Sequence, residues 1–134
     1  MVITRGARVL LVDDDNEVRA TTELVLQAIG YVVIAAASGA EALTLFEDGT
    51  AVDLLVTDVV MPEMSGADLA SEVRSRLPAL PIIFISGYAD PAAVSGRKTL
   101  QPLIRKPFRA VDLAQALEQS LSDARKIAAM RSIS

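Results

Sequence analysis

The chain has 134 residues, a length that suits one domain with a sizeable core. Hydrophobic residues make up 51% of it and charged residues 22%, which is typical of a globular rather than a disordered protein. The formal charge of −4 argues against direct nucleic-acid binding, the lack of cysteine excludes thiolate chemistry, and the lack of histidine removes the commonest general base. We find no signal peptide or membrane span in the sequence, so we expect a cytoplasmic protein without a membrane partner.

The first third of the chain predicts a strand, a helix and a second strand. Residues 8–12 form the first strand, and Asp15 or Asn16 can cap the helix that follows. Gly30 ends this helix, and the β-branched stretch 31–36 predicts the second strand. The helix carries an apolar stripe of Val18, Thr21, Leu24, Val25, Ala28 and Ile29.

The central strand of the sheet is predicted at residues 53–57, where a nearly continuous apolar run stops at Asp58. A second helix precedes this strand, over about residues 38–47. Its start is marked by the capping-box pair Ser38 and Glu41.

The third helix and the fourth strand follow the same alternation. Ser65 and Asp68 mark the start of the helix, and Pro78 closes it. Residues 81–85 predict the fourth strand. The buried stripe expected on the helix consists of Leu69, Ala70, Val73 and Leu77.

The last part of the chain is less regular. Residues 89–101 predict at most a short or distorted helix, and residues 103–105 predict a brief fifth strand. A last helix runs from near Ala110 to about residue 129. We therefore expect one domain over residues 1–130 and a frayed tail over 131–134. Five strands alternating with helices imply an α/β fold with a parallel, doubly wound sheet.

Polar residues follow four of the predicted strands. Asp13 and Asp14 follow the first strand, and Asp58 the third; Ser86 and Lys106 follow the fourth and fifth. Because the carboxyl ends of parallel strands share one edge of the sheet, these side chains are expected in one crevice. Each residue has a plainer interpretation: a helix cap for the acidic triplet, a turn for Ser86, and a solvated loop charge for Lys106.

Together the five residues predict a phosphoryl-transfer site. Three crowded carboxylates repel one another unless a cation is present, and oxygen ligands without His or Cys suit Mg²⁺. Lys106 supplies a positive charge, and Ser86 can donate to an anionic oxygen. Asp58 is the best candidate nucleophile because it follows the middle strand.

The chain resembles the receiver domain of bacterial two-component response regulators. The resemblance lies in four stretches, "VLLVDDD", "DLLVTDVVMPEMSG", "FISGYAD" and "IRKPF", in the family's order over about residues 7–122. It implies a flavodoxin-like (βα)₅ fold with strand order 2-1-3-4-5. It also implies that the chain is a phosphoprotein of the two-component phosphorelay rather than an enzyme. A histidine kinase or phosphotransfer protein would be the partner that donates the phosphoryl group, and the chain would carry it as an aspartyl phosphate.

The resemblance also assigns a role to each site residue. Asp58 would accept the phosphoryl group, and Lys106, before a cis bond to Pro107, would contact it. Ser86 would be the switch hydroxyl. The ligands of Mg²⁺ would be Asp13, Asp14, Asp58 and the backbone carbonyl of Val60.

Two departures from the family pattern concern the output of the switch. The aromatic residue that often stands three positions before the lysine is Leu103 here, and Tyr88 could take its role or simply cover loop backbone. The stretch 89–101 is a poor match to a regular fourth helix. The wording "SGYAD" resembles receivers of hybrid sensor kinases and single-domain regulators with a reduced fourth helix.

Two other functions compete with the signalling module. A haloacid-dehalogenase-like phosphatase would use Asp13 and Asp15 as an Asp-x-Asp pair, although no cap domain fits this length. A binding scaffold would keep the fold and work without phosphorylation. The output would be an unknown partner protein or an attached domain, and the last helix could pair with a second copy to form a homodimer.

Overall fold

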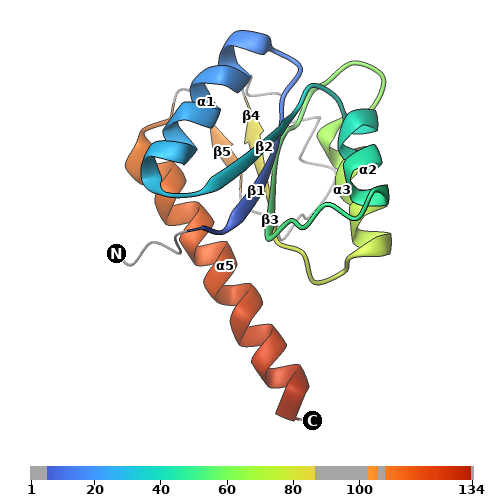
Figure 1. Cartoon of the computed structure of the whole chain (residues 1–134), viewed down its shortest axis with the longest axis vertical. Coiled ribbons are helices and arrows are strands. Elements are labelled where there is room, and N and C mark those ends of the chain that lie inside the picture. Colours follow the sequence, from blue (N-terminus) through green and yellow to red (C-terminus); the bar gives the residue numbers. More distant parts are fainter. Residues whose placement is uncertain (1–5, 87–102, 106–107, 134) are drawn as a thin grey trace.

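Five parallel strands form one sheet in the order β2-β1-β3-β4-β5. The computed structural model describes residues 6–86, 103–105 and 108–133 (Figure 1). Its strands are β1 (Arg8–Val12), β2 (Val32–Ala36), β3 (Leu54–Asp58), β4 (Ile82–Ser86) and β5 (Leu103–Arg105). The predicted α/β architecture and strand order, including the short fifth strand, are confirmed.

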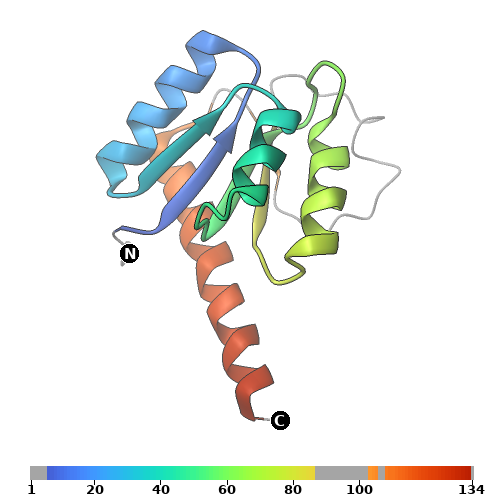
Figure 2. The same cartoon turned by 45° about the vertical axis from the view of Figure 1, so that its right-hand side comes forward.

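Helices cover both faces of the sheet. In Figures 1 and 2, α1 (Asn16–Ile29) and α5 (Ala110–Ile133) lie on one face, and α2 (Gly39–Glu47) and α3 (Gly66–Arg76) lie on the other. The end of α5 projects past the sheet and reaches Ile133, beyond the end near residue 129 that the sequence predicts. The prediction for residues 89–101 lies outside the described residues. None of the helices in the described ranges has the length and apolar character needed to cross a membrane.

The residues predicted to cap the first three helices are their N-cap residues. Asp15 is the N-cap of α1, and Ser65 with Asp68 forms a reciprocal capping box at α3. At α2, the Ser38 hydroxyl accepts the Glu41 N–H at 3.1 Å, as predicted. The Glu41 carboxylate, however, accepts the N–H of Ala37 rather than that of Ser38. The second hydrogen bond of the predicted capping box is therefore made to the residue before the N-cap.

The core has two halves, one on each face of the sheet, because the central strands are buried on both sides. Leu54, Leu55 and Val56 of β3 have no exposed surface. Leu55 packs toward α2 and α3 with Leu10 and Leu69, among others. The opposite half, under α1 and α5, contains Leu54 and Val56 with Val9, Leu11, Leu26, Ile83, Ile85, Leu113 and Leu117.

Two predicted stripes are wrong in detail. On α1 the fully buried residues are Thr22 and Leu26, whereas Leu24 is 66% exposed and Thr21 and Ala28 also face solvent. This helix has apolar residues around much of its circumference, so spacing alone does not select the buried line. On α3 the predicted Leu77 is 43% exposed because it is the C-cap residue before Pro78, outside the helix.

A buried hydrogen bond joins α5 to the start of β2. The Tyr31 phenol donates to a carboxylate oxygen of Glu118 at 2.5 Å, and both residues are at most 9% exposed. Burial and then this hydrogen bond, together with the charge of Glu118, raise the pKa of Tyr31 well above its usual value. The bond therefore requires a neutral phenol.

We expect Tyr31→Phe to lower the free energy of unfolding by about 1.5–3 kcal/mol, since Glu118 loses a donor to its charge. In the wild type, the stabilisation is complete below the ordinary phenol pKa of about 10 and is lost as the pH rises further, because the unfolded phenol ionises first. Urea unfolding of both proteins from pH 7 to pH 11 checks this. If the free energy of unfolding of the two proteins changed equally with pH above pH 10, the prediction would be contradicted.

Candidate functional site

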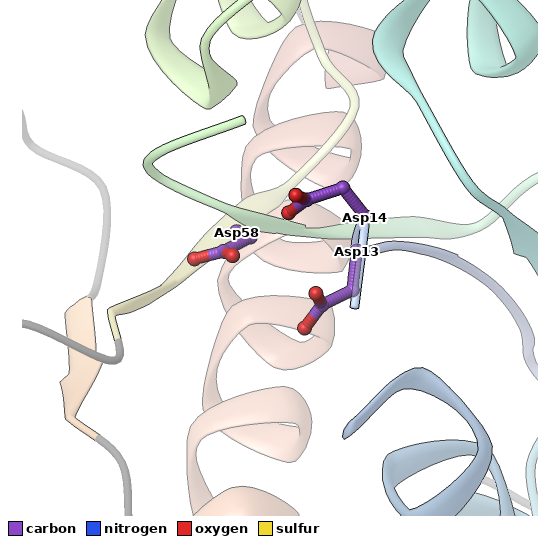
Figure 3. A group of neighbouring side chains, drawn as sticks. All are labelled: Asp13, Asp14 and Asp58. Atoms are coloured by element: carbon purple, nitrogen blue, oxygen red, sulfur yellow. The ribbon is translucent and has the colours of Figure 1, made fainter. Parts of the chain in front are cut away.

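The ends of β1 and β3 bring three carboxylates together. Asp13 and Asp14 follow β1, Asp58 is the last residue of β3, and the two strands are hydrogen-bonded neighbours. One carboxylate oxygen from each of the three lies within 4.8 Å of the others. Figure 3 shows the three side chains directed to the same side of the sheet edge. The predicted acidic cluster is therefore present.

The acidic triplet after β1 divides its roles between capping and clustering. Asp15 accepts the N–H groups of Glu17 and Val18 at 3.0 and 3.1 Å, so it caps α1. Asp13 is only 2% exposed, and its Oδ1 accepts the Asp15 N–H at 2.9 Å. Both interpretations of the triplet thus hold, for different residues: Asp15 is the cap, while Asp13 and Asp14 belong to the cluster.

The backbone on either side of Asp58 is held from two directions. The Thr57 hydroxyl donates to the carbonyl of Asp58 at 3.0 Å, and the Val59 N–H donates to the carbonyl of Ile85 in β4 at 3.1 Å. Asp58 itself is half-buried at the strand end. Its side chain is therefore presented from a firm backbone rather than from a loose loop.

Of the other predicted site residues, Ser86 and Val60 lie in the part of the chain that the structure describes. Ser86 is the last residue of β4, is 6% exposed, and lies at the same sheet edge, since its neighbour Ile85 pairs with Asp58. Val60 follows in the loop and is 53% exposed; the direction of its carbonyl stays a prediction. Lys106, its bond to Pro107, and Tyr88 lie outside the described residues.

A glycine closes the loop after Asp58, and the sequence alone assigns it no role. The Gly66 N–H donates to the carbonyl of Val59 at 2.8 Å, which closes the loop. A Cβ on Gly66 would lie 2.0 Å from the Asp58 carbonyl oxygen, so only glycine fits. Within the loop, Glu63 has a φ of 67°, and the Met64 N–H donates to the Pro62 carbonyl at 2.7 Å, which makes a tight γ-turn. The Ser65-Gly66 pair at the start of α3 was the signal available in the sequence.

The chemistry of the cluster fits a hard divalent cation. Its donors are carboxylate oxygens from Asp13, Asp14 and Asp58, with no nitrogen or sulfur ligand among them. Mg²⁺ prefers such ligands at about 2.0–2.1 Å and commonly keeps several waters. Ligands on one such ion lie up to about 4.2 Å apart, which is close to the 4.8 Å that bounds the three carboxylate oxygens.

Comparisons with known proteins agree on one family. The model of the response regulator receiver domain matches residues 9–118. The chain is 41% identical over 122 residues to the sensor kinase CckA of Brucella abortus, and it is 36% identical over 118 residues to the response regulator receiver protein CpdR of the same organism. These alignments cover 89% and 85% of the chain; they span 13% of CckA and 96% of CpdR.

A solved structure has the same fold. The response regulator receiver protein from Sinorhizobium medicae superimposes with a TM-score of 0.81 at 31% sequence identity. The match covers 89% of this chain and 97% of the other. Similarity thus extends over both the sequence and the fold.

Proposed function

The chain belongs to the response regulator receiver domain family, and on that premise we propose that Asp58 accepts a phosphoryl group from a histidine kinase or histidine phosphotransfer protein. Receiver domains accept a phosphoryl group on an aspartate in two-component phosphorelay signalling. The family is a signalling module and not a classical enzyme. In our proposal, any catalysis by the chain is limited to its own phosphorylation and autodephosphorylation.

One observation carries the choice of Asp58. Its carboxylate ends the central strand within 4.8 Å of the carboxylate oxygens of Asp13 and Asp14, which come from the neighbouring strand end. Asp13 is engaged by the backbone of Asp15 and is almost fully buried, whereas Asp58 is half-buried. Of the three, Asp58 therefore combines a place on the central strand with partial access to solvent.

The reaction needs little from the protein beyond positioning and charge. A carboxylate oxygen of Asp58 forms a bond to phosphorus, while the bond from phosphorus to the donor's histidine nitrogen breaks and its electron pair returns to that nitrogen. Asp13, Asp14, Asp58 and the Val60 carbonyl would hold Mg²⁺, which offsets charge on the phosphoryl oxygens when it is bound. Lys106 would contact one of these oxygens.

Phosphorylation then acts as a local electrostatic switch. The new group carries about −1.5 to −2 charges at neutral pH. We propose that the Ser86 hydroxyl turns toward it and shifts an existing loop equilibrium, which changes the affinity for a partner. The position of Ser86 at the end of β4, one residue past the partner of Asp58, supports this role.

Intact-mass measurement tests the proposal directly. With Mg²⁺ and a small acyl-phosphate donor, the wild-type chain is expected to gain the mass of one phosphoryl group, and the Asp58→Asn variant is expected to gain none, because an amide oxygen is a poor nucleophile. Removal of Mg²⁺ with a chelator should abolish the gain. No gain in the wild type, or an undiminished gain in Asp58→Asn, rejects the role of Asp58.

The family assignment and the turn after β1 both disfavour the phosphatase alternative. That function needs Asp15 beside the reacting phosphate, yet its carboxylate caps α1. The scaffold alternative is separated by measuring partner affinity with and without phosphorylation. We also propose that residues 1–130 form one cytoplasmic receiver unit. Its output would be a partner protein or an attached domain, and two copies would pair through α5.

A further inference from the structure

A guanidinium lies beside the acidic cluster, and the predicted site does not use it. Arg19, in the first turns of α1, donates through Nη1 to the backbone carbonyl of Asp13 at 2.8 Å. Its Nη2 donates to the side-chain oxygen of Asn16 at 2.7 Å. The Arg19 side chain is partly buried over the turn between β1 and α1.

These contacts anchor the piece of backbone that carries two of the three clustered carboxylates. The Asp13 N–H donates to the carbonyl of Ala36 in β2 at 3.2 Å, so its amide is tied to the sheet. Its carbonyl is tied to Arg19 and its carboxylate to the Asp15 N–H. Asp14, which is exposed, lies between these fixed points. Arg19 thus closes the turn from the helix side.

We propose that Arg19 is a positioning residue that pre-organises the turn for binding a divalent cation; this inference rests on the proposed function of the cluster. A planar guanidinium offers two donors in a rigid fork, and here one donor holds the strand end while the other holds the start of the helix. Groups that orient metal ligands commonly change affinity by about 10–100-fold when they are removed.

Electrostatics alone predicts the opposite effect. Arg19 is a permanent positive charge beside an anionic site, so its removal should strengthen the binding of a cation if charge were its only contribution. Loss of positioning should weaken binding, because Asp13 and Asp14 then sample geometries that do not converge. The sign of the change in affinity therefore distinguishes the two roles.

The experiment is a titration with Mn²⁺ alone, followed by the electron paramagnetic resonance signal of the free ion, on folded variants of the full chain. Arg19→Ala is expected to weaken Mn²⁺ binding about tenfold, at the lower end of the range for such partners. Arg19→Lys, which keeps the charge and loses the fork, should weaken it less. In acyl-phosphate assays the Mg²⁺ concentration for half-maximal rate should rise for Arg19→Ala, while the rate at saturating Mg²⁺ stays close to that of the wild type.

Arg74 provides a matched control. Its Nη1 also donates to backbone carbonyls, those of Pro78 and Leu80 at 3.1 and 2.7 Å, beyond the end of α3 and before β4 begins. Arg74→Ala should lower the melting temperature without changing Mn²⁺ affinity, which separates general destabilisation from loss of positioning.

Three results would overturn the inference. The first is an Arg19→Ala variant that binds Mn²⁺ as tightly as the wild type or more tightly. That result overturns the role of Arg19 and leaves the function of the cluster intact. If Arg19→Ala does not fold, unchanged affinity in Arg19→Lys has the same meaning. Failure of the wild type itself to bind Mn²⁺ removes the proposed metal site, and the inference with it.

Discussion

Gly66→Ala is expected to slow phosphorylation by about 100-fold and to lower the free energy of unfolding by up to about 2 kcal/mol. Gly66 is the first residue of α3, where alanine would normally be favoured by about 1 kcal/mol. The added Cβ, however, would lie 2.0 Å from the Asp58 carbonyl oxygen and 3.1 Å from the Val59 Cα. Both contacts are with backbone, so the loop or the end of β3 must move, and such overpacking commonly costs about 1–3 kcal/mol.

The kinetic effect follows because the displaced atom belongs to the phosphoacceptor itself. A misplacement of about 1 Å at a reacting group can cost about 100-fold in rate. The rate of acyl-phosphate labelling, measured by intact mass on the folded protein, gives one readout and urea unfolding gives the other. Gly49→Ala is the control: its φ of 80° makes alanine strained, but no atom lies within 4 Å of the new Cβ. It should lose stability and keep its labelling rate. Wild-type labelling in Gly66→Ala would show that the contact does not matter.

Asp14→Asn is expected to stabilise the metal-free protein and to abolish most of its stabilisation by Mg²⁺. At the 4.8 Å limit that bounds the cluster, two unit charges repel by roughly 1 kcal/mol even at the dielectric constant of water. Because Asp14 is exposed, its removal should raise the free energy of unfolding by about that amount without leaving a buried cavity.

With Mg²⁺ present, we expect the wild type to be more stable than Asp14→Asn. A ligand at 100 times its dissociation constant stabilises the folded state by about 2.7 kcal/mol, and the wild type should show a gain of this kind that Asp14→Asn largely lacks. Urea unfolding with and without Mg²⁺ measures both effects. Glu72→Gln, which removes an exposed carboxylate of α3 outside the cluster, should behave as the wild type in both conditions. Equal Mg²⁺ stabilisation of wild type and Asp14→Asn would exclude Asp14 as a ligand.

The strands and the acidic strand ends could be predicted because they depend on short-range patterns, whereas the strand order was implied by the family resemblance. Apolar runs such as Leu54–Val56 identify strands buried on both faces, and cap residues such as Asp15 and Ser65 identify where the helices start. Parallel pairing then places Asp13 and Asp58 at one edge without further information.

The sequence was less informative wherever two elements meet. Leu24 and Leu77 are apolar and have helical spacing, yet both face solvent. The packing of α1 on the sheet leaves Leu24 uncovered, and Leu77 lies at the C-cap, where α3 has already ended. The bond from Tyr31 to Glu118 joins positions 87 residues apart, and no local pattern indicates it.

By itself, then, the sequence determined the α/β class, the five strands, the family resemblance and the acidic residues of the site, since alternation of burial and the chemistry of strand ends are local properties. Only the tertiary structure decided which aspartate of the triplet caps α1, why glycine is required at position 66, and that Arg19 anchors the turn beside the cluster. Those features depend on distances between backbone atoms from different elements, and such distances exist only once the sheet has formed.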